Sequence, residues 1–424
     1  MRGRVSTVWR FLLVGLYVLV AACDPGEVRL LSPENSGTGG APRLSIHAVV
    51  DTPYAALAAS LGWTAGVPGA EVRVHLMAEP YGETYWHRAT ADSIGLAKFP
   101  NLLAGLYEVV VTRPLTAAET AQAPSGVRLL AGGRRLDGPS TRPLDVTVAP
   151  DQRSSLVFGE IALAWPLPWD IPSEVATDVK YFEVFNNSDT TIYLDGKYWG
   201  IGWHLNSDYS AWPCAQTAIV RNDPEGIWAQ YIFRFPGTGR DYGLEPGQPA
   251  LIAKAAIDHR AVDPRLWDLS HADFEWGGYR AADNPDVPNL QQIGLGPMPY
   301  FWPMEEAPEF LSEPVDLATL PRFLDPHSGT VWLRIPGTVV LDATARTIDW
   351  ASQSFAAAPA CLEDMHRSFE RLAGPAGAVS DFYEELSSQR RVLTVLPDGR
   401  KVLQDANTSM VDFVKVARTP GWIP

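Results

Sequence analysis

The sequence predicts a mostly β protein with two sandwich-type domains. Its 424 residues include 36 prolines and 35 glycines, which interrupt helices and favour short strands joined by turns. No long helical pattern alternates with strands, and this argues against a parallel βαβ fold. Because 46% of the residues are hydrophobic and 20% are charged, the chain can bury a sizeable core.

The charge balance indicates which partners to expect. The chain has 34 basic and 49 acidic residues, for a net charge of −15. Affinity for nucleic acid depends on basic surface that neutralises phosphates. We therefore expect no nucleic-acid partner.

Residues 1–22 have the pattern of a secretory signal peptide. Three arginines precede the uncharged apolar run Phe11–Ala22, which is shorter than the roughly 20 residues of a membrane-spanning helix. Residues 19–23 (LVAAC) resemble a bacterial lipobox, which implies a lipid on Cys23 and cleavage just before it. The alternative is an ordinary signal in which Cys23 is incidental. Residues 23–42, rich in Pro, Gly and Ser, then read as a flexible tether. We expect an exported lipoprotein held in the cell envelope by its lipid, at the outer membrane or the periplasmic face.

The two remaining cysteines, Cys214 and Cys361, lie in the part of the chain that would be exported. In an oxidising compartment they can form a disulfide, which would close a long loop. The alternative is two buried thiols that behave as small apolar residues.

Residues 43–154 read as one small β domain. Apolar and polar residues alternate over Ala70–Leu76, the period of a half-buried strand. Leu106–Val111 predicts a second strand. In Val127–Leu136, Gly132 and Gly133 separate two runs, which predicts a hairpin.

Short segments of this domain resemble a known family. Pro68–Val72, Ala89–Asp92, Gly95–Phe99 and Tyr107–Val109 are similar to the conserved turns and strands of the carboxypeptidase-regulatory-like sandwich. The resemblance implies an immunoglobulin-like stalk or binding module without catalytic activity.

Residues 155–424 predict a second β domain. Ser155–Leu163 reads as a strand, and Tyr181–Asp189 followed by Ile192–Gly196 reads as a hairpin. Together they resemble the opening of a lamin-tail-type sandwich, and Leu403–Ser409 resembles its end. The resemblance implies a second immunoglobulin-like sandwich whose middle holds long insertions. Pro397–Gly399 predicts a further hairpin turn.

The order of the two domains is similar to that of an uncharacterised bacterial lipoprotein family, in which a carboxypeptidase-regulatory-like sandwich precedes a lamin-tail-like domain. Gly237–Gly239 and Leu244–Gly247 add to this likeness. The resemblance implies an envelope protein of unknown activity. It supports an architecture more than any chemistry.

One polar cluster could bind a metal. His271, Asp273 and Glu275 alternate along the chain and would share one face of a strand, with Asp258 and His259 nearby. Their oxygens suit Ca²⁺, and the added imidazole suits a transition metal. The alternative is that the aspartates cap turns and the histidines lie on a solvated loop. We expect no cofactor, with calcium as the possible exception.

Tryptophans form a second group of candidate binding residues. Seven of the 15 tryptophans lie within residues 199–302, several in loop-like sequence. Aromatic side chains in loops either fill the core or form an exposed platform for sugars, apolar ligands or partners. The tryptophans that such a platform would use are Trp199, Trp203, Trp212, Trp276 and Trp302.

These observations favour a non-catalytic binding or accessory protein. It would recognise a ligand, for example a carbohydrate, or an outer-membrane transport complex through its aromatic loops. The sequence lacks the common serine-nucleophile, zinc-protease and phosphate-loop motifs. Two alternatives stay open. One is a purely structural spacer. The other is a secreted hydrolase with metal or carboxylate chemistry built from Asp258, His259, His271, Asp273 and Glu275.

Overall fold

The fold is mostly β, in sheets that pack as sandwiches, as the sequence predicts. The helices of the described chain are short: α2 (Ala55–Ser60), α3 (Ala117–Thr120), α7 (Ser409–Asp412) and the 3₁₀ turns η1 (Thr52–Tyr54), η2 (Glu83–Tyr85), η3 (His259–Ala261) and η4 (Gly337–Val339). The computed structural model describes residues 43–79, 83–124, 127–151, 153–163, 170–172, 175, 178–202, 223, 225–278, 281–294, 309–324, 329, 331–344, 365–366, 371–372 and 386–421. Within these residues no helix is long and apolar enough to cross a membrane.

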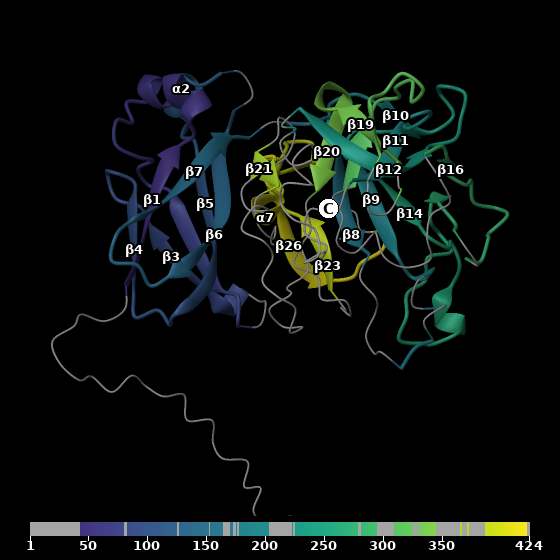
Figure 1. Cartoon of the computed structure of the whole chain (residues 1–424), viewed down its shortest axis with the longest axis horizontal. Helices are drawn as coiled ribbons and strands as arrows, with labels where there is room; N and C mark the ends of the chain where they lie inside the picture. The colour runs from purple at the N-terminus through teal and green to yellow at the C-terminus, as the bar shows by residue number, and fades with distance from the viewer. Residues whose placement is uncertain are drawn as a thin grey trace, which may run out of the picture. The chain divides into compact units, whose positions relative to one another are not determined.

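Seven strands build the first sandwich (Figure 1). One layer is β4-β1-β7 and the other is β3-β2-β5-β6, and β7 also touches β6 over two residue pairs. β1 runs parallel to β7 and antiparallel to β4. The strands are β1 (Arg43–Val50), β2 (Glu71–Leu76), β3 (Trp86–Thr90), β4 (Leu96–Pro100), β5 (Gly105–Pro114), β6 (Leu129–Gly138) and β7 (Leu144–Pro150).

The core of this sandwich follows the period-two pattern of its strands. β1 buries Leu44 and Ile46 between the layers, and β2 buries Val72 there. The expectation that β2 is half-buried is wrong, because Arg73 and His75 on its other face are buried too. β2 is therefore covered on both faces, and its alternating polar side chains do not mark a solvated surface.

Gly132 does not form the predicted hairpin turn. β6 continues unbroken through both glycines and pairs with β5 along its whole length. A Cβ atom at Gly132 would lie 1.9 Å from the carbonyl oxygen of Thr147 on β7. The glycine is needed because β6 and β7 approach closely where the two layers meet, which is a known use of glycine inside a strand.

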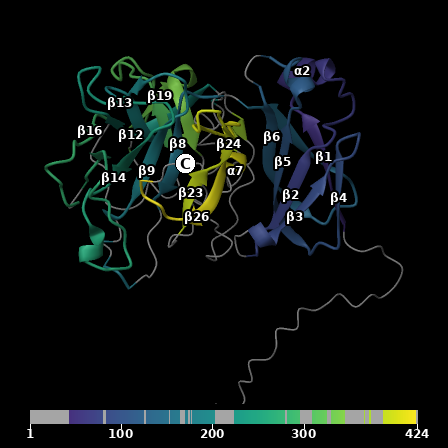
Figure 2. The same cartoon turned by 180° about the vertical axis from the view of Figure 1, so that it is seen from behind.

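The second sandwich packs two large sheets face to face (Figure 2). One has the order β18-β19-β12-β11-β17-β20, with β16 beside β12, and the other has the order β15-β14-β9-β8-β23-β26. Three small two-stranded sheets, β10-β13, β21-β22 and β24-β25, accompany them. The strands are β8 (Leu156–Ala162), β9 (Tyr181–Asn186), β10 (Ile192–Tyr193), β11 (Tyr198–Gly202), β12 (Gly226–Arg234), β13 (Gly243–Leu244), β14 (Pro249–Ala253), β15 (Phe274–Glu275), β16 (Gln291–Gln292), β17 (Glu309–Ser312), β18 (Arg322–Leu324), β19 (Val331–Pro336), β20 (Val340–Thr344), β21 (Met365–His366), β22 (Arg371–Leu372), β23 (Leu386–Arg390), β24 (Val392–Val395), β25 (Lys401–Leu403) and β26 (Phe413–Ala417).

The hairpin predicted at residues 181–196 does not form. β9 pairs with β8 and β14, whereas β10 pairs with β13. The amide nitrogen of Asn186 donates to the carbonyl oxygens of Thr190 (2.8 Å) and Leu244 (2.6 Å). This side chain holds a turn that carries the chain out of one sheet and into another. The hairpin predicted at Pro397–Gly399 is confirmed, since β24 and β25 pair antiparallel across it.

Residues 42–424 form one compact unit, and α7 contributes to its packing. Met410 and Val411 of α7 pack in a small apolar cluster with Val110 and Leu129 of the first sandwich. A Cβ atom at Gly133 would lie 2.8 Å from the sulfur of Met410. The C-terminal part of the chain is therefore fitted against β5 and β6.

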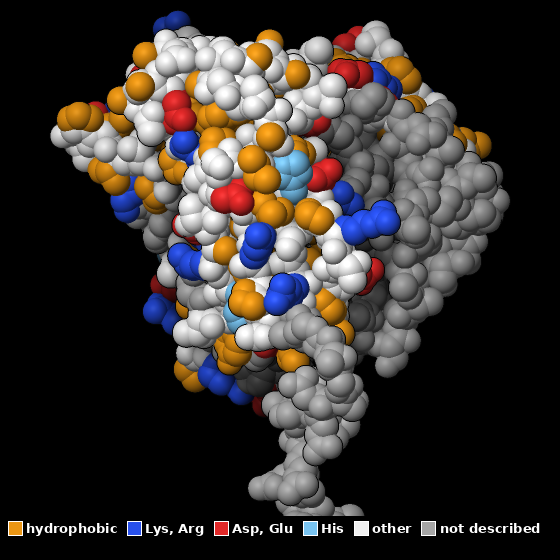
Figure 3. All heavy atoms as spheres, turned by 90° about the vertical axis from the view of Figure 1, so that its left-hand side faces the viewer, with side chains coloured by type: hydrophobic (Ala, Val, Ile, Leu, Met, Phe, Trp, Pro, Cys, Tyr) orange, Lys and Arg blue, Asp and Glu red, His pale blue; other side chains and the backbone are white. Residues whose placement is uncertain are grey.

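The surface of the first sandwich is mixed in charge. On the face shown in Figure 3, Lys and Arg side chains are interspersed with Asp and Glu among apolar and uncharged groups.

Candidate functional site

The structure separates the residues predicted to bind a metal. Asp258 caps η3: its carboxylate accepts from the backbone N–H of Arg260 (3.1 Å) and from Nε of the same residue (2.8 Å). The Arg260 guanidinium also donates to Asp268 (2.6 Å). Its hydrogen bond holds the pKa of Asp258 below the usual range. The carboxylates of Asp258 and Asp268 therefore stabilise a turn and pair with Arg260, as the alternative interpretation expected for the aspartates.

The other predicted ligands point to separate partners. The imidazole of His259 is buried with Nε2 at 3.2 Å from the carbonyl oxygen of Ala255, and burial lowers the pKa of His259. His271 is exposed. Asp273 accepts from the backbone N–H of Leu251 (2.8 Å).

Glu275 likewise accepts backbone N–H groups, from Ala256 (2.9 Å) and Asn284 (3.0 Å). β15 spans only Phe274–Glu275, so no regular strand aligns residues 271, 273 and 275 on one face. Within the described residues, no three His, Cys, Asp or Glu side chains are placed to hold a metal ion. The predicted metal site is therefore wrong for these five residues.

Two tryptophans of the predicted platform lie in the core. Trp199 is 0% exposed, and its ring centroid lies 5.0 Å from that of Phe233, 4.6 Å from that of Phe182 and 5.1 Å from that of Trp276. Trp276 is buried as well. Both fill the space between the two large sheets, so the platform interpretation is wrong for them and the core interpretation holds. The other three predicted platform residues lie outside the described residues: Trp203, Trp212 and Trp302.

The three cysteines also lie outside the described residues. The lipid on Cys23 stays a prediction. So does the choice between a Cys214–Cys361 disulfide and two free thiols.

A buried charge cluster holds the C-terminal strands together. Arg390 of β23 donates from Nη2 to Asp342 of β20 (2.5 Å). Its Nη1 lies 3.6 Å from Asp405 and 3.7 Å from Asp412. All four side chains are almost fully buried. One cation therefore faces three carboxylates in a medium of low dielectric, where uncompensated charge is costly.

Burial shifts two aspartates of this cluster toward their protonated form. Burial raises the pKa of Asp342 to about 7 and that of Asp412 to about 7, against the attraction of the Arg390 guanidinium. Asp412 also accepts from the backbone N–H groups of Ala406 (2.9 Å) and Thr408 (3.2 Å). The cluster thus ties the loop before α7 to β20 and β23.

The free energy of unfolding should fall as pH rises from about 5 to about 8. Both aspartates have a higher pKa in the folded state than in the unfolded state. The folded protein therefore binds more protons, and stability present at low pH is lost as pH rises through about 7. We expect a loss on the order of 5 kcal/mol, because each aspartate contributes about 1.4 kcal/mol per pH unit between pH 5 and 7; urea denaturation across this range measures it. Asp412→Asn should flatten this dependence, and an unchanged slope would contradict the assignment.

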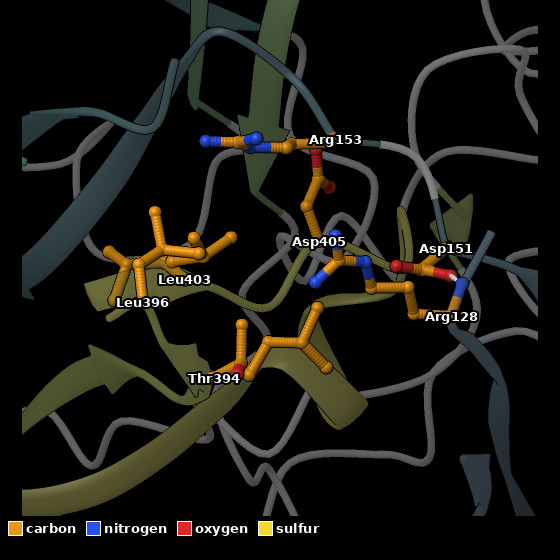
Figure 4. Close-up of a pocket in the computed structure, with 9 residues that line it drawn as sticks. Arg128, Asp151, Arg153, Thr394, Leu396, Leu403 and Asp405 are labelled. Carbon is orange, nitrogen blue, oxygen red and sulfur yellow. Dashed lines mark hydrogen bonds between the residues drawn. The ribbon is translucent and has the colours of Figure 1, made fainter. Parts of the chain in front are cut away.

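A pocket lies beside the β24–β25 hairpin (Figure 4). Its volume is about 90 Å³. Side chains from the first sandwich, from the segment that follows it and from Asp405 just after the hairpin supply the charged part of the wall. The hairpin supplies the apolar part. The lining residues are Arg128, Asp151, Arg153, Leu393, Thr394, Leu396, Val402, Leu403 and Asp405.

The charged residues of the pocket are placed by short contacts. Oδ1 of Asp151 accepts from the backbone N–H groups of Arg128 (2.9 Å) and Leu129 (2.8 Å), which fixes the ends of β6 and β7. Arg153 donates to the carbonyl oxygen of Asn187 (2.8 Å) and pairs with Asp189 (3.1 Å). Burial raises the pKa of Asp151.

Sequence reasoning missed this pocket. Its lining residues come from four short stretches between residues 128 and 405, and no motif connects them. The one usable signal was the Pro397–Gly399 turn, which predicts a hairpin with apolar strands. Nothing in the sequence places Arg128 opposite that hairpin.

No family model matches the chain, and no curated protein matches it. Among solved structures, the chain is similar to a DUF4876 family protein from Bacteroides thetaiotaomicron. The two share 17% sequence identity with a TM-score of 0.46, over 90% of this chain and 99% of that chain.

Proposed function

We propose that this chain is a non-catalytic, lipid-anchored binding protein of the cell envelope, and that its ligand enters the pocket beside the β24–β25 hairpin. The pocket carries this proposal: it sets charged groups next to the first sandwich opposite aliphatic side chains of the second. A mostly apolar wall with a few placed polar groups is typical of small-ligand sites. The pocket replaces the tryptophan platform, because Trp199 and Trp276 belong to the core.

The N-terminal sequence supports the envelope location. Three arginines, a short apolar run and a cysteine preceded by small residues are what export and lipidation require. Two acyl chains on Cys23 would hold the protein at a membrane, although its net negative charge is not attracted to anionic lipids. An outer-membrane transport complex or a surface carbohydrate remains the proposed partner that presents the ligand.

The competing function is a purely structural spacer. The packing of Met410 and Val411 against Val110 and Leu129 favours it, because this apolar contact braces the C-terminal segment against the first sandwich. A spacer needs no pocket and binds nothing saturably. The two functions therefore differ in an outcome that can be measured.

The test is affinity capture of the tagged, lipidated protein from its own membranes, with mass identification of what it retains. Thr394→Phe should fill the pocket and reduce capture of the ligand or partner at least about tenfold. Val395→Phe is the matched control, because Val395 is the next residue of β24 and is 57% exposed. Thermal melting should show both variants folded. Equal capture by the wild type and both variants would favour the spacer. Intact mass spectrometry tests the anchor: if the mature protein does not begin at an acylated Cys23, the proposed lipid anchor is wrong.

A further inference from the structure

We propose that the pocket binds a small aliphatic carboxylate, which pairs with the Arg128 guanidinium and lays its hydrocarbon part against the β24–β25 hairpin. The inference rests on the proposed function and names the chemistry of its ligand. The ligand is either a free short-chain acid or the carboxylate-bearing end of a larger molecule. Three features of the pocket lead to this class.

The first feature is the guanidinium of Arg128. It makes no hydrogen bond or ion pair with any residue that the structure describes, and Figure 4 shows it directed into the pocket. Arg153, the other cation of the wall, is already engaged by Asn187 and Asp189. A planar guanidinium with free N–H groups suits a carboxylate, which it can bind through two parallel hydrogen bonds.

The second feature is the aliphatic wall. The hairpin contributes four branched side chains, Leu393, Leu396, Val402 and Leu403, which favour a hydrocarbon group over a polar one. The volume of about 90 Å³ is small, so the pocket suits the end of a short branched chain.

The third feature is that the two acidic residues of the wall do not neutralise Arg128. Asp405 accepts the backbone N–H of Ser154 (3.0 Å) and lies 3.6 Å from Arg390, so both of its oxygens already have partners. Asp151 uses Oδ1 on two backbone N–H groups. Because burial raises the pKa of Asp151, its carboxylate repels an anionic ligand less as pH falls. Binding should therefore weaken as pH rises through that pKa.

The experiment is calorimetric titration of the purified full chain with 4-methylpentanoate, with N-acetyl-leucine and with the matched amine, 4-methylpentylamine. We expect saturable binding of a carboxylate and none of the amine. Arg128→Gln should weaken carboxylate binding at least about tenfold. Arg142→Gln is the matched control with the same change of charge, because Arg142 lies in the turn at the opposite end of β6, about 30 Å away.

Asp151→Asn keeps an oxygen for the two backbone N–H groups and removes the negative charge. It should tighten carboxylate binding at neutral pH, whereas it would weaken binding of an ammonium ligand.

Tighter binding of 4-methylpentanoate indicates a free acid, and tighter binding of N-acetyl-leucine indicates a chain end. Binding unchanged in Arg128→Gln, or preference for the amine, would overturn the ligand class. If Thr394→Phe abolishes membrane capture while neither acid binds, the function stands and the ligand class fails.

Discussion

Replacing Arg390 with methionine is expected to lower the free energy of unfolding by about 3–5 kcal/mol. The substitution keeps a long apolar stem and removes the cation that Asp342, Asp405 and Asp412 share. Nε and Nη1 of Arg390 also donate to the carbonyl oxygens of Phe158 (2.7 Å) and Gln404 (3.0 Å), which would lose a partner. Breaking one side of a buried ion pair leaves uncompensated charge, and here three carboxylates are left behind.

Arg400 provides the control for this prediction. Its guanidinium pairs with Asp398 (2.7 Å) and Asp189 (3.3 Å) at the surface. Arg400→Met should change stability by less than about 1 kcal/mol, the usual value of an exposed pair. Urea denaturation followed by tryptophan fluorescence measures both variants. The loss in Arg390→Met should grow with pH, because carboxylates without a cation need protons to stay buried. Equal effects of the two substitutions would contradict the central role of Arg390.

Trp199→Ala is expected to destabilise the protein by about 3–5 kcal/mol. The indole is 0% exposed and contacts three other rings, so its removal leaves a large cavity between the two sheets. Trp199→Phe should cost clearly less. The phenyl ring keeps most of the contacts, and the indole N–H has no acceptor among the described residues.

Tyr193→Ala is the surface control for the tryptophan, because Tyr193 is 37% exposed on the short strand β10. Its effect should stay within about 1 kcal/mol. Thermal and chemical denaturation measure the three variants. A Trp199→Ala protein that melts like the wild type but loses its ligand would restore the platform interpretation.

Local sequence patterns were informative wherever local forces decide the structure. The strands at Leu106–Val111 and Ser155–Leu163 form because apolar, β-branched residues are bounded by turn residues. The hairpin at Pro397–Gly399 forms for the same reason. Gly132 shows where this reasoning fails: its role is set by a carbonyl on another strand, and no local pattern encodes that approach.

The candidate sites depended on long-range placement and were harder to predict. Asp258 and Glu275 look like ligands in sequence, yet each is engaged by backbone N–H groups or by a neighbouring arginine. Trp199 reads equally well as a core or a surface residue until the two sheets are brought together. Arg390 and Asp342 form a fully buried ion pair, and nothing in their local sequence indicates that they meet.

The sheet order of the second sandwich has a consequence for folding during synthesis. β8 is an interior strand whose neighbours are β9 and β23, so one of its edges is closed only by residues near the end of the chain. During synthesis that edge stays open until more than two hundred further residues have followed. Contacts between such distant segments form slowly, and an open strand edge invites pairing with other chains. The strands of the first sandwich pair with one another and need no strand from the C-terminal part of the chain, so this sandwich can fold early. The sheet that contains β8 is complete only after the last strands have been synthesised.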